Sequence, residues 1–131
     1  MKKIHGNYEE SYARIPAMCK EMLKRNPGSV AKCRMDQATG QFQSVTIGYG
    51  AALKAWPRGC RPILGLDGCH LTGKYGGVLL AITGLDGNNG LYPLAFMITR
   101  SEGYEAWYEF LEIMKPFLEE HLRALVFISD Q

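Results

Sequence analysis

Apolar residues in the first part of the chain recur at the spacing of a helix. Between residues 8 and 25 they lie three or four positions apart, as on one face of an α-helix. These residues are Tyr8, Tyr12, Ile15, Cys19, Met22 and Leu23. Pro16 interrupts the backbone hydrogen bonds, so the pattern predicts either a kink at this residue or a helix that starts there. The segment NPGS (26–29) follows a basic turn and predicts the end of the helix.

A hairpin and a short helix are predicted next. Residues 29–35 and 41–47 have strand-like composition, and the turn-like segment DQATG lies between them. A short helix is expected around residues 51–56, closed by Pro57 and Gly59.

From residue 61 the pattern becomes stronger. Apolar runs at 61–71, 78–86 and 91–100 are separated by the turn sequences TGKYGG and GNNG. A helix is predicted over 103–120 and a fourth apolar strand over 123–131. The order β-β-β-α-β predicts an α/β fold with an antiparallel meander, in which the crossover helix lets the last strand lie parallel to the first.

The helix predicted over 103–120 carries an apolar stripe and an acidic stripe. The apolar stripe is expected to face inward and contains Tyr104, Trp107, Tyr108, Leu111, Met114 and Leu118. The acidic stripe is expected to face solvent and contains Glu105, Glu109 and Glu112.

Composition and cysteine spacing narrow the class of protein. The 131 residues are 47% hydrophobic and 21% charged, which fits one soluble domain with a core of its own. No apolar run has the length of a membrane span and no signal peptide is visible, so we expect a location in the cytosol or nucleus. The cysteines form no C-x-x-C pair, so a structural zinc site is not expected. Free and mostly buried thiols are expected instead. They are Cys19, Cys33, Cys60 and Cys69.

Charge is distributed unevenly along the chain. Residues 1–35 hold eight Lys or Arg and three Glu, whereas residues 36–131 hold seven Lys or Arg and ten Asp or Glu. The basic part can either contact phosphate groups or form the solvated face of a helix.

An aspartate in the middle of an apolar strand is the main candidate for chemistry. Asp67 lies within 61–71, and burying an unpaired carboxylate is costly. Asp130 ends the fourth strand, and if the two strands are parallel neighbours their carboxyl ends bring both aspartates together. Two close carboxylates repel unless a cation lies between them, and oxygen ligands favour Mg²⁺ or Mn²⁺.

Simpler roles exist for each candidate. Asp67 can cap the turn at Gly68, and Asp130 can end a strand. Asp86 and Glu102 lie at element ends, where turn or cap roles are expected. Cys69 and His70 are neighbours in a predicted strand and point to opposite faces, so they are not expected to form a nucleophile–base pair.

Several segments resemble the catalytic core of plant Mutator-like element (MULE) transposases. The resemblance rests on GCRPILGLDGCHLTGKYGGVLLAITGLDGNNGLYPLAF, SEGYEAWYEFL and FISDQ, with NPGS matching the segment before the core. It covers about residues 8–131 and is most specific over 59–96. It divides the chain into an N-terminal helical and hairpin segment, 1–58, and the first part of a ribonuclease H-like catalytic domain, 59–131.

The resemblance implies a fold, a site and a partner. Such transposases have a ribonuclease H-like fold and a DDE triad that binds two divalent metals for DNA strand cleavage and transfer. Asp67 matches the first Asp of the triad and Asp130 the second. The expected partners are transposon-end DNA and Mg²⁺ or Mn²⁺, and the expected location is the nucleus.

The sequence also departs from that family. The third acid is expected on a helix beyond Asp130, and Glu102, Glu105 and Glu109 come too early to replace it. A truncated catalytic domain, inactive alone, is therefore expected, and an uncovered sheet edge predicts self-association or a protein partner. Two alternatives are a non-enzymatic nuclear module that binds DNA or protein, and a transposon remnant without function.

Overall fold

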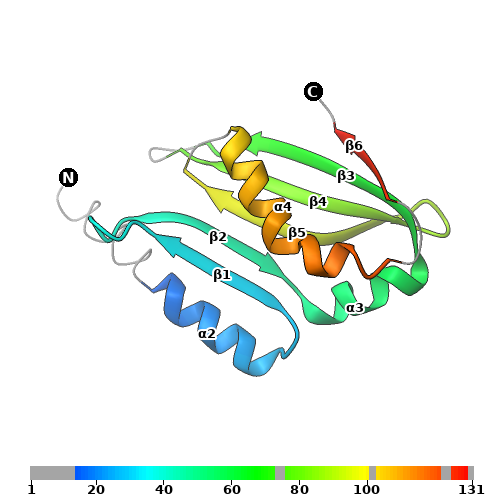
Figure 1. Cartoon of the computed structure of the whole chain (residues 1–131), viewed down its shortest axis with the longest axis horizontal. Helices are drawn as coiled ribbons and strands as arrows, with labels where there is room; N and C mark the ends of the chain where they lie inside the picture. The colour runs from blue at the N-terminus through cyan, green and yellow to red at the C-terminus, as the bar shows by residue number, and fades with distance from the viewer. Residues whose placement is uncertain (1–13, 73–75, 101–102, 122–124, 130–131) are drawn as a thin grey trace.

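The computed structural model describes residues 14–72, 76–100, 103–121 and 125–129, and these residues form one mixed β-sheet with three helices. Figure 1 shows the sheet, whose strand order is β1-β2-β5-β4-β3-β6. The strands are β1 (Val30–Met35), β2 (Phe42–Gly48), β3 (Cys60–His70), β4 (Val78–Asp86), β5 (Leu91–Thr99) and β6 (Val126–Ser129). The helices are α2 (Ile15–Arg25), α3 (Gly50–Gly59) and α4 (Tyr104–Leu118). None of the helices in these ranges is long and apolar enough to cross a membrane.

The predicted β-β-β-α-β order is confirmed. β3, β4 and β5 form an antiparallel meander, α4 crosses over, and β6 pairs with β3 in parallel. The predicted N-terminal hairpin is also present as β1 and β2, and β2 pairs with β5. The hairpin therefore extends the same sheet on the side opposite to β6.

Aspartate side chains hold the turns of two hairpins, β4–β5 and β1–β2. Asp86 Oδ1 accepts hydrogen bonds from the backbone N–H groups of Asn88 (2.9 Å) and Gly90 (2.7 Å), and Asn89 has a positive φ of 65°. Asp36 Oδ1 accepts from the N–H groups of Ala38 and Thr39 in the β1–β2 turn. The turn role expected for Asp86 is confirmed.

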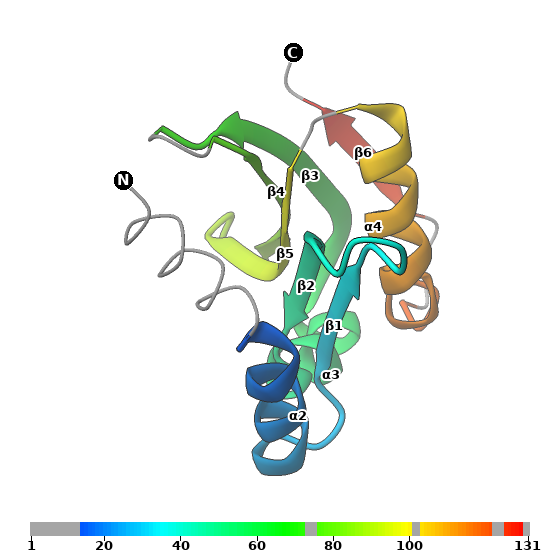
Figure 2. The same cartoon turned by 90° about the vertical axis from the view of Figure 1, so that its left-hand side faces the viewer.

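Two apolar clusters cover opposite faces of the sheet. On β5, Met97 belongs to the cluster under α3 and α4, whereas the next residue, Ile98, packs with the cluster under α2. Because successive residues of a strand face opposite sides, α4 and α2 lie on different faces, as Figure 2 shows. The fully buried side chains of the larger cluster include Trp56, Leu64, Leu80, Ile82, Met97, Phe110 and Met114.

The predicted helices are present, with small differences in their bounds. α2 starts at Ile15 with Pro16 in its first turn, so among the described residues the helix starts near Pro16, and residues 8–13 lie outside the described ranges. The helix expected around residues 51–56, closed by Pro57 and Gly59, is α3 and includes both of these residues. Pro57 removes only the one hydrogen bond that its missing N–H would donate, and the N–H of Cys60 still donates to the Trp56 carbonyl.

The inward stripe of α4 is rotated from the prediction. Tyr104 and Tyr108 were expected to face the core but are 82% and 57% exposed. Ala106 and Phe110 are buried in their place, together with Met114 and Leu118, which were correctly predicted. The two tyrosine rings instead lie near each other on the surface, with centroids 6.2 Å apart.

Candidate functional site

Asp67 lies in β3, opposite Ala81 of β4, and its side chain is exposed. The expectation that this carboxylate is buried in an apolar strand is wrong. The burial of β3 is confined to its first half, where Leu64 is fully buried, and residues 67–70 are all exposed. Asp67 therefore keeps contact with solvent and needs no buried partner to offset a desolvation cost.

The neighbours of Asp67 along β3 show which face of the sheet it occupies. A Cβ atom built on Gly68 would lie 3.1 Å from Leu80 and 3.7 Å from the Trp107 ring of α4. Gly68 thus faces α4, and alternation along the strand directs Asp67 to the opposite face. Ile63, Gly65 and Cys69 share that face with Asp67, because successive residues of a strand alternate between its faces.

The parallel strand β6 ends beside Asp67. The described pairs of β3 and β6 begin with Ile63 and Val126 and end with Leu66 and Ser129. In the sequence, each residue of the last pair comes immediately before an aspartate, Asp67 in β3 and Asp130 after β6. Asp130 itself lies outside the described residues, as does Glu102.

The described side chains alone do not assemble a metal site. Within residues 14–72, 76–100, 103–121 and 125–129, no group of three or more His, Cys, Asp or Glu side chains is placed to hold a metal ion. Of the two aspartates predicted as metal ligands, Asp67 lies in this part of the chain, and it is exposed. Its oxygen atoms fit a hard cation such as Mg²⁺ or Mn²⁺ better than zinc.

The cysteines are free, but they are less buried than expected. Cys19 is buried, Cys33 and Cys60 are half-buried, and Cys69 is exposed, so the expectation of mostly buried thiols is wrong. Burial raises the pKa of Cys19, Cys33 and Cys60, with smaller contributions from Cys19 at Cys33 and from Asp86 at Cys60. These groups are therefore poorer nucleophiles than ordinary thiols.

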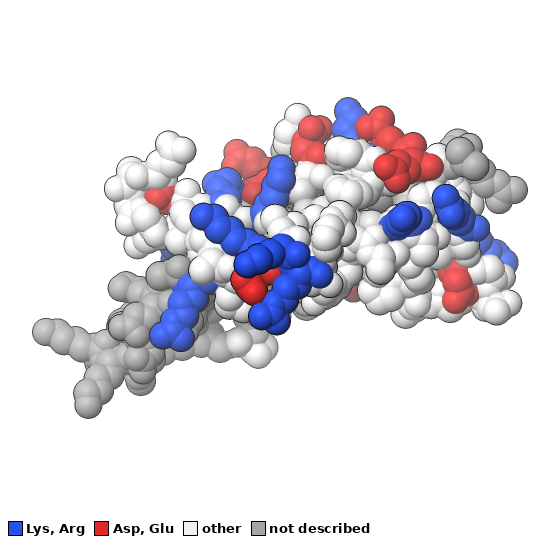
Figure 3. Space-filling model, turned by 90° about the horizontal axis from the view of Figure 1, so that it is seen from below, with Lys and Arg blue, Asp and Glu red and all other residues white. Residues whose placement is uncertain are grey.

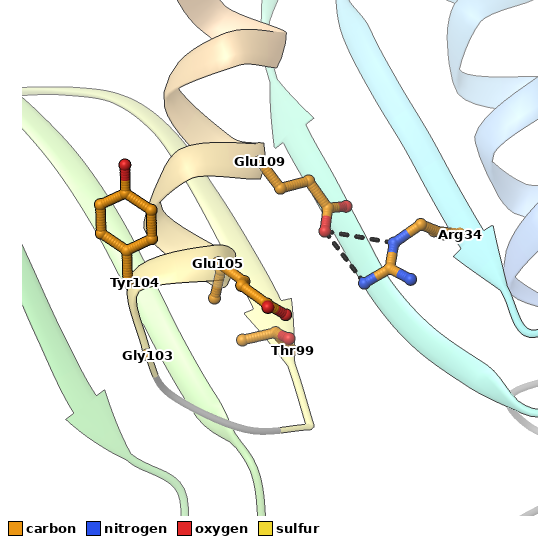
Figure 4. A pocket seen from close by; sticks show the side chains of 7 residues that line it. Arg34, Thr99, Gly103, Tyr104, Glu105 and Glu109 are labelled. Atoms are coloured by element: carbon orange, nitrogen blue, oxygen red, sulfur yellow. Dashed lines mark hydrogen bonds and ion pairs between the residues drawn. The ribbon is translucent and has the colours of Figure 1, made fainter.

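Glu109 departs from the solvated acidic stripe predicted for α4. Its Oε2 accepts a 2.7 Å hydrogen bond from Ser44 Oγ, and its Oε1 accepts from Arg34 Nε at 3.1 Å. The Arg34–Glu109 pair lines a hollow of about 410 Å³ beside the first turn of α4, whose wall also includes Thr99, Tyr104 and Glu105 (Figure 4). No local sequence pattern could have indicated this contact, because Arg34 and Glu109 are 75 residues apart.

Basic side chains gather over α2 and β1. Figure 3 shows this blue surface, and the exposed residues of these two elements that form it are Lys20, Lys24, Arg25, Lys32 and Arg34. Ala31 and Cys33 of β1 pack with α2, so the alternate residues Lys32 and Arg34 project from the other face of the sheet, and the five side chains lie around its β1 edge. We call these five residues the basic surface.

Comparison with protein families identifies the relationship of the chain. The model of the MULE transposase domain family matches residues 63–131, just over half of the 131 residues. The chain therefore belongs to the MULE transposase domain family. Comparisons with curated proteins and with solved structures found no match. The matched range begins within β3 and contains both Asp67 and Asp130.

Proposed function

We propose that this chain is part of a ribonuclease H-like transposase catalytic domain that cleaves and transfers DNA strands. The supporting observation is the parallel pairing of β3 with β6, whose last described pair directly precedes Asp67 and Asp130 in the sequence. The MULE family match spans both strands. Open α/β sheets place their sites at the carboxyl ends of parallel strands, and the described part of β6 ends level with Leu66, the residue before Asp67.

In this proposal Asp67 and Asp130 hold Mg²⁺ or Mn²⁺. The bound cation would supply charge stabilisation for the attacking and leaving oxygen atoms of a DNA phosphate. The exposure of Asp67 suits this role, because the DNA backbone must reach the ligand from solvent. Two carboxylates are fewer than the three that the family uses, so residues 1–131 alone are expected to have little or no strand-transfer activity.

A metal titration tests the proposal directly. Mn²⁺ binding is followed by electron paramagnetic resonance for the wild-type chain, Asp67→Asn, Asp130→Asn and the control Glu112→Gln. Each aspartate variant should weaken binding at least about tenfold, since even the loss of a group that supports a metal ligand costs that much. Glu112 is exposed on α4 and its variant should bind like the wild type. Unchanged affinity in Asp67→Asn would refute the metal assignment.

A non-enzymatic nuclear module that binds DNA is the second candidate function. The basic surface favours it, because this feature lies on elements outside the matched range and needs no metal. The Mn²⁺ titration, combined with a measurement of duplex DNA binding, separates the two functions. A chain that binds duplex DNA but no Mn²⁺ would fit the module, whereas metal binding that depends on Asp67 fits the catalytic domain.

The edge of the sheet at β6 supports a further proposal, self-association between copies of the chain. Val126, Phe127 and Ile128 are 54%, 47% and 55% exposed, and β6 carries no charged residue. Apolar edge strands without charges pair readily with other strands. We place the protein in the nucleus on the strength of its family alone.

A further inference from the structure

We propose that the basic surface on α2 and β1 is the docking site for the phosphate backbone of duplex DNA. This inference rests on the proposed function, because membership of a transposase family makes DNA the expected polyanion. It assigns that contact to residues 20–34, which precede the matched range 63–131.

Burial fixes the direction in which the lysines of α2 point. Cys19 is buried, and Ile15 and Met22 pack beside it against β1 and β2. Lys20 and Lys24 are exposed on the other side of the helix, one turn apart. The apolar face of α2 is thus occupied by the sheet, and its cationic face is available to a ligand.

Ion pairing leaves several of these cations without a carboxylate partner. Glu21 is the one acidic residue between residues 14 and 35, and its Oε1 pairs with Arg25 Nε at 2.8 Å. Arg34 pairs with Glu109. Among the residues that the structure describes, Lys20, Lys24 and Lys32 form no ion pair. Within this part of the chain their charge is uncompensated and is therefore available to phosphate groups.

Spacing matches the repeat of a nucleic-acid backbone. One turn of α2 separates Lys20 from Lys24 by about 5.4 Å along the helix, and one DNA strand advances about 3.4 Å for each phosphate. The two ammonium groups can therefore reach phosphates one or two steps apart. Lys32 lies in β1, the edge strand of the sheet, whose outer backbone N–H groups have no strand partner among the described residues and can also donate to phosphate oxygen atoms.

The salt dependence of DNA binding tests this assignment. Fluorescence anisotropy measures the affinity of the chain for a labelled duplex of arbitrary sequence over a range of salt concentrations. The wild type is compared with Lys20→Ala, Lys24→Ala, Lys32→Ala and the triple variant. Each lysine that neutralises a phosphate contributes about 0.9 to the slope of log affinity against log salt, so the triple variant should have a slope shallower by about 2.7. Lys115→Ala, an exposed lysine on the acidic helix α4, is the one-charge control and should leave the slope unchanged.

Three results would overturn the assignment. They are an unchanged slope in the triple variant, an equal reduction in Lys24→Ala and Lys115→Ala, and absence of duplex binding by the wild type. Binding of poly-glutamate in preference to the duplex would reassign the surface to an acidic protein. None of these results bears on Mn²⁺ binding by Asp67. Conversely, loss of Mn²⁺ binding in Asp67→Asn with unchanged duplex affinity supports both assignments as separate sites.

Discussion

The hydroxyl group of Ser44 donates a 2.7 Å hydrogen bond to Oε2 of Glu109, which joins strand β2 to helix α4. Ser44 is only 1% exposed, so its hydroxyl group has no access to bulk water. Oε1 of the same carboxylate forms an ion pair with Nη2 of Arg34 in β1, at 3.0 Å. One side chain on α4 therefore holds both strands of the N-terminal hairpin to the helix that precedes β6.

Replacement of Glu109 should destabilise the fold. Glu109→Ala leaves the buried Ser44 hydroxyl group without its acceptor, which costs about 1–3 kcal/mol. Glu112→Ala makes the same substitution on the same helix at an exposed position and should cost much less. Urea unfolding measures both free energies, and equal losses would show that the Ser44 hydrogen bond contributes nothing.

Asp36 should make the stability depend on pH in the acid range. The backbone N–H groups of Thr39 and then Ala38 hold the pKa of this carboxyl group below its ordinary value of 3.8. Its contribution is therefore fully present above the unfolded pKa and is lost as the pH falls through the folded pKa, below 3.8.

Asp36→Asn keeps an acceptor in the turn but removes the charge. The difference in urea midpoint between the wild type and this variant should be constant near neutral pH and should shrink as the pH falls below 3.8. Nuclear magnetic resonance titration of the Asp36 carboxyl group gives the folded pKa directly. A value at or above 3.8 would contradict the role of the two N–H groups.

A charge on β6 should suppress self-association. Ile128→Lys places a cation on the edge strand, where it opposes pairing with a second copy. Sedimentation velocity should show a smaller associated fraction than in the wild type. Leu91→Lys is the control, since Leu91 is 77% exposed but lies at the start of β5, inside the strand order. An equal effect of both variants would mean that general solubility, not the β6 edge, controls association.

Most of the fold could be predicted because its signals are local. The strands β3, β4 and β5 are long apolar runs, and turn residues such as Asn89 and Gly90 lie between them. The stripe on α4 was misassigned because Tyr104 and Tyr108 have the spacing of a buried face. Ala106 is a small residue that permits close approach of α4 to the sheet. Nothing in a single sequence indicates that it lies on the buried side of the helix.

The candidate site was predictable in position but not in environment. The place of Asp67 in the first strand of the meander and the parallel pairing of β3 with β6 follow from element order. The exposure of Asp67 depends on what covers the face of β3 opposite to α4, which no local pattern reveals. The contact between Arg34 and Glu109 joins residues 75 positions apart and is likewise tertiary.

The pairing of β3 with β6 also has a consequence for biosynthesis. Within the meander, paired residues such as Cys69 and Leu79 are near each other in the sequence. Ile63, in contrast, pairs with Val126, which is synthesised much later. Because closing longer loops costs more entropy, the meander can form while later residues are still being synthesised, and β6 joins last. During that interval the outer edge of β3 is open, and the strand that carries Asp67 is accessible to chaperones or to neighbouring nascent chains.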